Sequence, residues 1–370
     1  MSRLQCGLSA ILVLLLCYTN TSFAQEIKIG VINEKIILEG TVVEKETQLP
    51  IPGAHVYLNK TTVVSATDKE GRFRIETGLK GTFEFVVSFV GFKRQVFPLK
   101  LEQNGYKKYE FEIELEEKLY QPGEITVTGS NKRWRRNFKA FRDNFIGQKD
   151  FADQTSIQNY TDLEFDDKNR SEFTAKSATP LEIINHALGY KIIMELEEFN
   201  WDLRRGNGHY LVYERYAELE PKDEAEKTIW ERNRQIAFRG SARHFFQSLF
   251  EKNSFEEGFT YRLPTSLREI SGTDFVYLKA AGEIPDTDHY RFYHLRRLIK
   301  VNVRDVQKPS MLDTNDRGEI IGVDKYGNLY DPLSVRISGY WAHNRIGEQL
   351  PFDYIYKPKR KTNSDTVENE

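Results

Sequence analysis

The sequence predicts a multidomain protein, in which a seven-stranded all-β sandwich precedes an α+β domain with mostly antiparallel strands. Residues 109–115 alternate apolar and acidic side chains, and residues 82–89 place three phenylalanines and a valine on one face. A period of two is typical of a strand with one buried and one exposed face. Helical periodicity after residue 132, followed by further strand patterns, predicts the α+β domain.

The chain begins with the pattern of a secretory signal peptide, residues 1–24. One basic residue precedes the apolar run Ile11–Leu16, and a small-x-small motif ends at Ala24. The run is shorter than the roughly 18 residues that a membrane span needs, so we favour cleavage over an N-terminal anchor. Both cysteines, Cys6 and Cys17, lie inside this signal, so the mature chain would carry no disulfide or thiolate site. The alternative to cleavage after Ala24 is a lipoprotein signal in which Cys17 is acylated.

Turn residues separate the strands that we expect between residues 37 and 116. Pro50–Gly53 and Asp68–Gly71 are turn sequences, and Gly78 and Gly91 mark two further turns. Glycine can adopt positive φ without a steric cost, which tight turns often require. Seven short strands at this spacing indicate a β-sandwich.

The motifs of this segment resemble the carboxypeptidase-regulatory-like domain, a transthyretin-like sandwich common in exported proteins of the Bacteroidetes. The matching residues are Gly40, Val42, Pro52-Gly53-Ala54, Val56, Asp68, Gly71, Phe73, Ser88 and Gly91-Phe92. The resemblance concerns residues 37–118 only, and it implies an accessory module for docking or stability. The remainder of the chain is similar to the uncharacterised region that follows this sandwich in other short Bacteroidetes proteins.

Three further segments follow the sandwich. Residues 119–131 are interpreted as a linker, because Pro122-Gly123 and Gly129-Ser130 enclose one short β-like run. Residues 132–356 form the α+β domain of unknown function. Residues 357–370 are polar and unpatterned, which predicts a disordered tail.

The segment Lys132–Ile146 predicts an amphipathic helix. Trp134, Phe138 and two later phenylalanines recur at spacings of four, three and four, while basic residues that include Arg135 and Arg136 cover the other faces. One interpretation is a helix on an anionic membrane surface or in the groove of a partner. We favour the other interpretation, a helix packed in the core with exposed basic faces.

Strand and helix patterns alternate through the rest of the domain. The expected elements are a hairpin around residues 167–170, two strands joined by Arg204–Gly208, helices at Glu224–Phe238 and Ala242–Lys252, and strand-like runs at His289–Val303, Glu319–Asp324 and Leu333–Trp341. Gly240 is expected to end the first helix of the pair. Ser241 is expected to cap the second.

No catalytic, cofactor-binding or metal-ligating residue is expected. Zinc carboxypeptidases bind their metal through an H-x-x-E pair, but none of the seven histidines has a glutamate three residues later. The G-x-S-x-G, S-x-x-K, Walker and G-x-G-x-x-G motifs are also missing from the sequence. Asp313–Asp324 partly matches a calcium loop, but Arg317 occupies a ligand position, so we favour a polar turn.

Aromatic residues offer the remaining candidates for a binding surface. Tyr340 and Trp341 could form a platform for sugar or peptide, although we favour a role in the domain core. Together with Trp134, Arg135, Arg136 and Phe138 they make up the candidate interaction residues.

These patterns favour an exported, non-enzymatic envelope protein, periplasmic or associated with the outer membrane. Its partner would be an unknown envelope protein or glycan. Peripheral contact with a membrane is compatible with these patterns. The chain has 53 basic and 55 acidic residues, a balance that does not favour nucleic acid. The alternative is a hydrolase of unknown type in the α+β domain.

Overall fold

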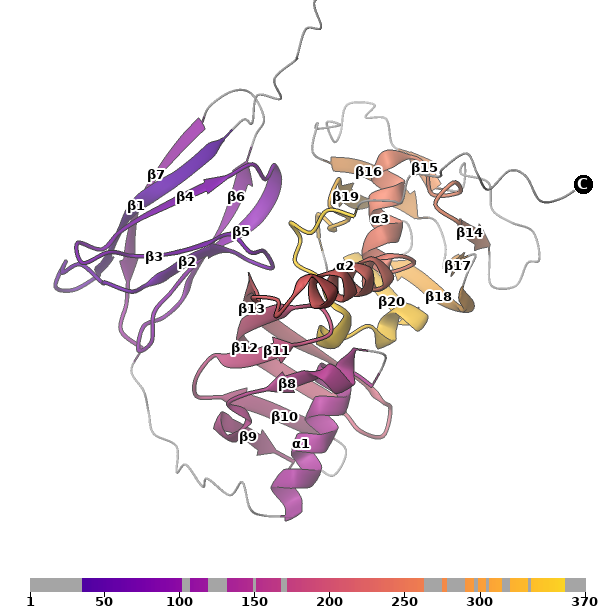
Figure 1. The fold of residues 1–370 in the computed structure, drawn as a ribbon, viewed down its shortest axis with the longest axis horizontal. Helices are drawn as coiled ribbons and strands as arrows, with labels where there is room; N and C mark the ends of the chain where they lie inside the picture. The colour runs from indigo at the N-terminus through magenta and orange to yellow at the C-terminus, as the bar shows by residue number, and fades with distance from the viewer. Residues whose placement is uncertain are drawn as a thin grey trace, which may run out of the picture. The chain divides into compact units, whose positions relative to one another are not determined.

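The computed structural model describes residues 35–101, 107–118, 132–148, 151–167, 172–262, 275–277, 290–295, 299–303, 306–314, 320–331 and 334–356. The expected signal peptide, linker and tail lie outside these residues. The described residues belong to one compact unit, and their elements are labelled in Figure 1. None of their helices is long and apolar enough to cross a membrane.

The N-terminal region is a sandwich of two sheets (Figure 1). Its strands are β1 (Ile36–Glu44), β2 (His55–Leu58), β3 (Val64–Ala66), β4 (Arg72–Thr77), β5 (Gly81–Ser88), β6 (Gln95–Leu101) and β7 (Lys107–Leu115). One sheet has the order β4-β1-β7, with β1 antiparallel to β4 and parallel to β7. The other has the order β3-β2-β5-β6, and all its pairs are antiparallel. The predicted seven-stranded sandwich is therefore confirmed.

Aromatic side chains fill the space between the two sheets. The rings of Phe85 and Phe111 stack with centroids 4.7 Å apart, and Phe73 packs beside both. A Cβ atom at Gly40 would lie 2.0 Å from the carbonyl oxygen of Phe111, so only glycine fits where β1 meets β7. Gly71 has φ +71°, the left-handed conformation that favours glycine in the turn before β4.

A six-stranded antiparallel sheet opens the α+β region. Its strands are β8 (Thr155–Ile157), β9 (Leu163–Asp166), β10 (Glu172–Ser177), β11 (Leu181–Asn185), β12 (Tyr190–Asp202) and β13 (Asn207–Glu218). The order is β8-β11-β12-β10-β9, and β13 pairs with β12 along almost its whole length. The expected pairings of β9 with β10 and of β12 with β13 are confirmed.

The described residues of this region form three α-helices (Figure 1). They are α1 (Lys132–Phe145), α2 (Glu224–Phe238) and α3 (Ala242–Glu251). In α1, Phe141 is fully buried, and its ring lies 4.8 Å from that of Phe199 in β12. The expected cap of α3 is confirmed, because the Ser241 hydroxyl accepts a hydrogen bond from the backbone N–H of His244 at 3.1 Å.

Two smaller antiparallel sheets follow the helices. One contains β14 (Phe259–Arg262), β17 (Ile299–Val303), β18 (Val306–Thr314) and β20 (Val335–Gly339), in that order. The other contains β15 (Phe275–Tyr277), β16 (Tyr290–Leu295) and β19 (Ile320–Asp324). Short 3-10 turns at Tyr340–His343 and Ile346–Glu348 follow β20. The single run expected at His289–Val303 thus contains two strands, β16 and β17, in different sheets.

Candidate functional site

The turn between β2 and β3 covers the free edge of β13. Lys60 N donates to the carbonyl oxygen of Glu214 at 2.8 Å, and Tyr216 N donates to that of Thr61 at 2.9 Å. The side-chain oxygen of Asn59 accepts from Glu214 N at 2.8 Å. An edge strand presents unpaired N–H and C=O groups, and this turn of the sandwich satisfies three of those on β13.

The same turn also contacts the last described segment of the chain. Phe352 N donates to the carbonyl oxygen of Lys60 at 2.7 Å. The carboxylate of Asp353 accepts from Thr62 N at 3.1 Å and from the Thr62 hydroxyl. The β2–β3 turn is therefore held between β13 and residues 350–356.

A second contact between sandwich and sheet centres on Arg94, which directly precedes β6. Its guanidinium pairs with the carboxylates of Glu195 and Glu197 in β12, the latter at 2.6 Å, and lies 4.0 Å from the ring centroid of Tyr213. The Arg94 side chain is only 14% exposed. Although burial opposes it, the pairing with two carboxylates raises the pKa of Arg94 above its ordinary value.

A pocket of about 240 Å³ lies beside the β2–β3 turn, and Glu214 is its buried acidic group. Val212, Glu214 and Tyr216 alternate on the inward face of β13, where the two flanking residues belong to the core. Glu214 is 1% exposed, and its Oε2 atom has no hydrogen-bond partner among the described residues. Burial raises the pKa of the Glu214 carboxyl, against the opposing effects of the Lys60 charge and a hydrogen bond with Tyr216.

Aromatic side chains and one partly buried cation complete the walls of this pocket. The rings are those of Phe238, Trp341 and Phe352, and Lys60 reaches the same space from the sandwich. Arg243, at the start of α3, donates to five backbone carbonyl oxygens, those of Tyr326, Leu350, Pro351, Phe352 and Tyr354. Burial lowers the pKa of Arg243 to about 10, so it stays charged at neutral pH. Its donors hold residues 350–354 and the backbone at Tyr326.

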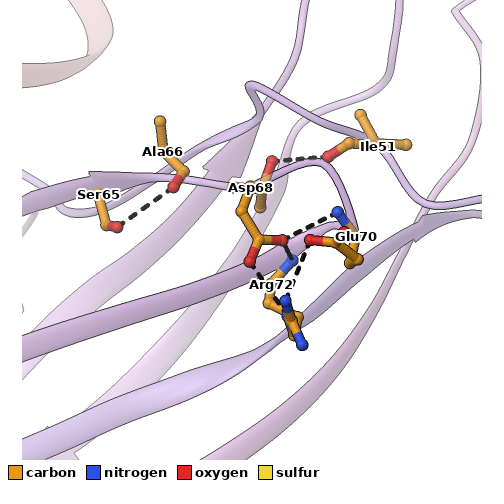
Figure 2. A network of polar contacts seen from close by, with 7 residues as sticks. Ile51, Ser65, Ala66, Asp68, Glu70 and Arg72 are labelled. Carbon is orange, nitrogen blue, oxygen red and sulfur yellow. Dashed lines mark hydrogen bonds and ion pairs between the residues drawn. The ribbon is translucent and has the colours of Figure 1, made fainter.

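A larger groove of about 920 Å³ lies over the β4-β1-β7 sheet of the sandwich. Figure 2 shows the polar network beside it, in which Asp68 accepts from Glu70 N at 3.0 Å and from Arg72 N at 2.8 Å. Arg72 also pairs with the carboxylates of Asp68 and Glu70, and Arg74 pairs with Glu39 at 2.6 Å. These exposed charges neutralise one another and close the predicted Asp68–Gly71 turn. The pocket at Glu214, with its unsatisfied buried oxygen, is the stronger candidate site.

The structure places the expected aromatic stripe of α1 against the six-stranded sheet. The Trp134 ring stacks on Phe138 with centroids 5.2 Å apart, and its Nε1 donates to the carbonyl oxygen of Leu163 at 3.0 Å. Both side chains are partly buried. Arg135 is exposed, and Arg136 pairs with a nearby aspartate at 2.9 Å.

The other two candidate residues lie in a different part of the core. Trp341 is 3% exposed, and its Nε1 donates to the carbonyl oxygen of Gly240 at 2.7 Å. Tyr340 is partly buried against the same cluster. The six candidate residues therefore do not form one surface, and Trp341 alone lines the Glu214 pocket.

Glu214 was not expected as a site residue. The available signal was its position in the alternation of Tyr210, Val212, Glu214 and Tyr216, where an acidic residue falls on the apolar face of the strand. Such a residue is either paired or functional.

The described residues of the segment Asp313–Asp324, which partly matches a calcium loop, have structural roles. Asp313 lies in β18 opposite Arg336, and Asp324 accepts hydrogen bonds from Tyr326 N and Asn328 N, each at 2.8 Å. Within the described part of the chain, no group of three or more His, Cys, Asp or Glu residues could hold a metal ion.

Residues 38–127 match the sequence model of the CarboxypepD_reg-like domain family. The match confirms the resemblance for the N-terminal domain and extends beyond β7. It leaves the α+β region unassigned. No curated protein matches the sequence.

Three solved structures show weak likenesses to this chain. A type II cohesin–X-dockerin complex from Acetivibrio cellulolyticus has 16% identity and a TM-score of 0.19, over 30% of this chain and 74% of that chain. A DUF3823 family protein from Bacteroides ovatus has 12% identity and a TM-score of 0.18, over 50% and 81%. A putative membrane-associated protein of unknown function from Bacteroides fragilis has 10% identity and a TM-score of 0.20, over 82% and 97%. TM-scores this low do not establish a shared fold, so these proteins assign no function here.

Proposed function

We propose that this chain is an exported, non-enzymatic protein of the bacterial cell envelope, in which the sandwich docks onto the α+β region and holds it for binding to an envelope protein or glycan. The observation that carries the proposal is the contact of the β2–β3 turn with β13 and with residues 350–356. The proposed division places the sandwich at residues 37–118 and the binding domain at residues 132–356.

The character of the contact supports docking rather than chance proximity. Three hydrogen bonds with β13 use its main-chain groups, which a mobile neighbour would leave to water. The pair of Arg94 with Glu195 has side chains only 14% and 18% exposed, so it is screened less than a surface pair. Export is supported by the signal-like sequence of residues 1–24.

The docking role is tested with a double variant, Arg94→Gln with Asp353→Asn, in the mature chain. We expect the parent protein to unfold in one calorimetric transition and the double variant in two, because the sandwich and the α+β region would then unfold separately. The matched control is Arg205→Gln with Asp153→Asn, since those side chains are 81% and 96% exposed. A single, unshifted transition in the double variant would contradict docking.

Two further measurements address the rest of the proposal. Cell fractionation should recover the protein with the envelope, and recovery in the cytoplasm would contradict export. Turnover of peptide, ester or glycoside substrates by the purified protein would favour the alternative, a hydrolase in the α+β region.

A further inference from the structure

We infer that the Glu214 pocket binds a compact, neutral polyol the size of one sugar ring, with the Glu214 carboxyl accepting a hydrogen bond from a ligand hydroxyl. This inference rests on the docking proposed above, because Lys60 reaches the pocket from the β2–β3 turn of the sandwich.

The unsatisfied oxygen of Glu214 is the first reason to expect a ligand. Buried polar atoms in native proteins almost always have a hydrogen-bond partner, so an exception requires an explanation. Glu214 is 1% exposed and lines the pocket, and its Oε2 atom has no partner among the described residues. Because Glu214 is 1% exposed, its carboxyl has to turn toward the pocket before a ligand hydroxyl can supply the missing donor.

The shape and lining of the pocket define the size and surface of the ligand. A volume of about 240 Å³ corresponds to about eight water molecules at about 30 Å³ each. This is room for one substituted ring. The rings of Phe238, Trp341 and Phe352 supply the aromatic part of the lining, together with its polar groups. A sugar ring has the matching character, with hydroxyls at its edge and C–H groups on its face.

The charges around the pocket indicate that the ligand is neutral. Lys60 and Arg243 are cationic, and Glu214 and Glu348 are their acidic counterparts in the lining. The Lys60 ammonium lies 5.5 Å from the ring centroid of Phe352, and its charge acts on Glu214. An ammonium or carboxylate ligand would add a charge that no further lining residue compensates. A neutral hydroxyl donor leaves the balance unchanged.

The experiment uses the mature chain with glucose, galactose, mannose, N-acetylglucosamine and myo-inositol as probes, measured by calorimetric titration. We expect at least one probe to bind the parent protein and to bind Glu214→Gln about tenfold more weakly, because the amide of the variant replaces the carboxyl group as hydrogen-bond partner. The matched control, Glu164→Gln, changes an exposed glutamate in β9 and should leave the affinity unchanged.

A second variant keeps the test decisive if Glu214→Gln does not fold. Lys60→Gln removes the ammonium but retains the backbone bonds of the turn, and it should also weaken binding. The inference is overturned if no probe binds, if both pocket variants bind as tightly as the parent, or if butylamine binds through Glu214 and the polyols do not. Docking of the sandwich onto the α+β region is measured separately, by the number of calorimetric unfolding transitions of each variant. A failure of docking is therefore distinguishable from a failure of polyol binding.

Discussion

Burial of an acidic side chain links the stability of this protein to pH at a single residue. Glu214 lies on the apolar face of β13, and burial raises the pKa of its carboxyl. A raised pKa means that the folded state holds the proton more tightly than the unfolded state does. The parent protein should therefore lose stability as pH rises through the window that begins at the ordinary carboxyl value and extends upward.

The substitution Glu214→Gln keeps the shape of the side chain and removes its titration. The free energy of unfolding of the parent should fall relative to that of the variant by about 1.4 kcal/mol per pH unit within the window. Urea unfolding of both proteins from about pH 4 to about pH 8 measures this difference. Parallel curves over that range would show that Glu214 keeps an ordinary pKa.

The strand that carries Glu214 was predictable from sequence, but the pocket was not. Alternation predicts a strand from Gly208 onward, and the structure confirms β13 there. The groups that surround Glu214 come from distant parts of the chain, and its backbone partner Asn59 is 155 residues away. Local sequence patterns do not predict such long-range contacts. The pocket could therefore be identified only from the folded structure.

At the scale of single elements, a substitution in α1 distinguishes an aromatic stripe that packs in the core from one that binds a membrane surface. Phe138 is partly buried, stacks on Trp134 and lies 5.3 Å from the ring centroid of Tyr160. Phe138→Asp should lower the free energy of unfolding by about 2–4 kcal/mol, because it removes this packing and adds a poorly solvated charge. Thermal melting monitored by circular dichroism measures the change.

The matched variant on the other face is Arg135→Glu with Arg136→Glu. Arg135 is exposed and the Arg136 side chain is 70% exposed, so the pair should change stability by no more than about 1 kcal/mol. If the helix instead binds membranes, Phe138→Asp would leave melting unchanged and abolish co-sedimentation with anionic vesicles. The double arginine variant, or added salt, would then weaken the same binding.

Elements with strong local signals were predictable, and those defined by tertiary contacts were not. The helices α2 and α3 have caps and breakers in their sequences, and both begin where expected. The strand β18 contains Pro309, which argues against a strand. In the structure its pairing with β17 is irregular between Val301 and Val303, the kind of position that tolerates proline. No local sequence pattern predicts that irregularity in the pairing of β17 with β18.

At the scale of the whole molecule, the two regions differ in how self-contained they are. Every buried residue of the sandwich core lies between Ile36 and Leu115, and among the described residues outside the sandwich only Tyr326 packs against it. The α+β region instead relies on the β2–β3 turn to pair the free edge of β13 and to hold residues 350–356. The sandwich is therefore expected to be independent of its neighbour, while the neighbour depends on the sandwich.

Two fragments test this asymmetry. Residues 26–120 should unfold cooperatively on their own, because their core and turns are complete. Residues 132–356 should melt at a lower temperature than the full mature chain and should aggregate more readily, because the edge of β13 is then exposed. Calorimetry and light scattering on both fragments and the mature chain measure these differences. Mixing the two fragments should restore part of the lost stability of the second, since the docking bonds are noncovalent. A non-cooperative melt of the first fragment would contradict an independent sandwich, and an unchanged melting temperature of the second would show that the β2–β3 turn contributes nothing to its stability.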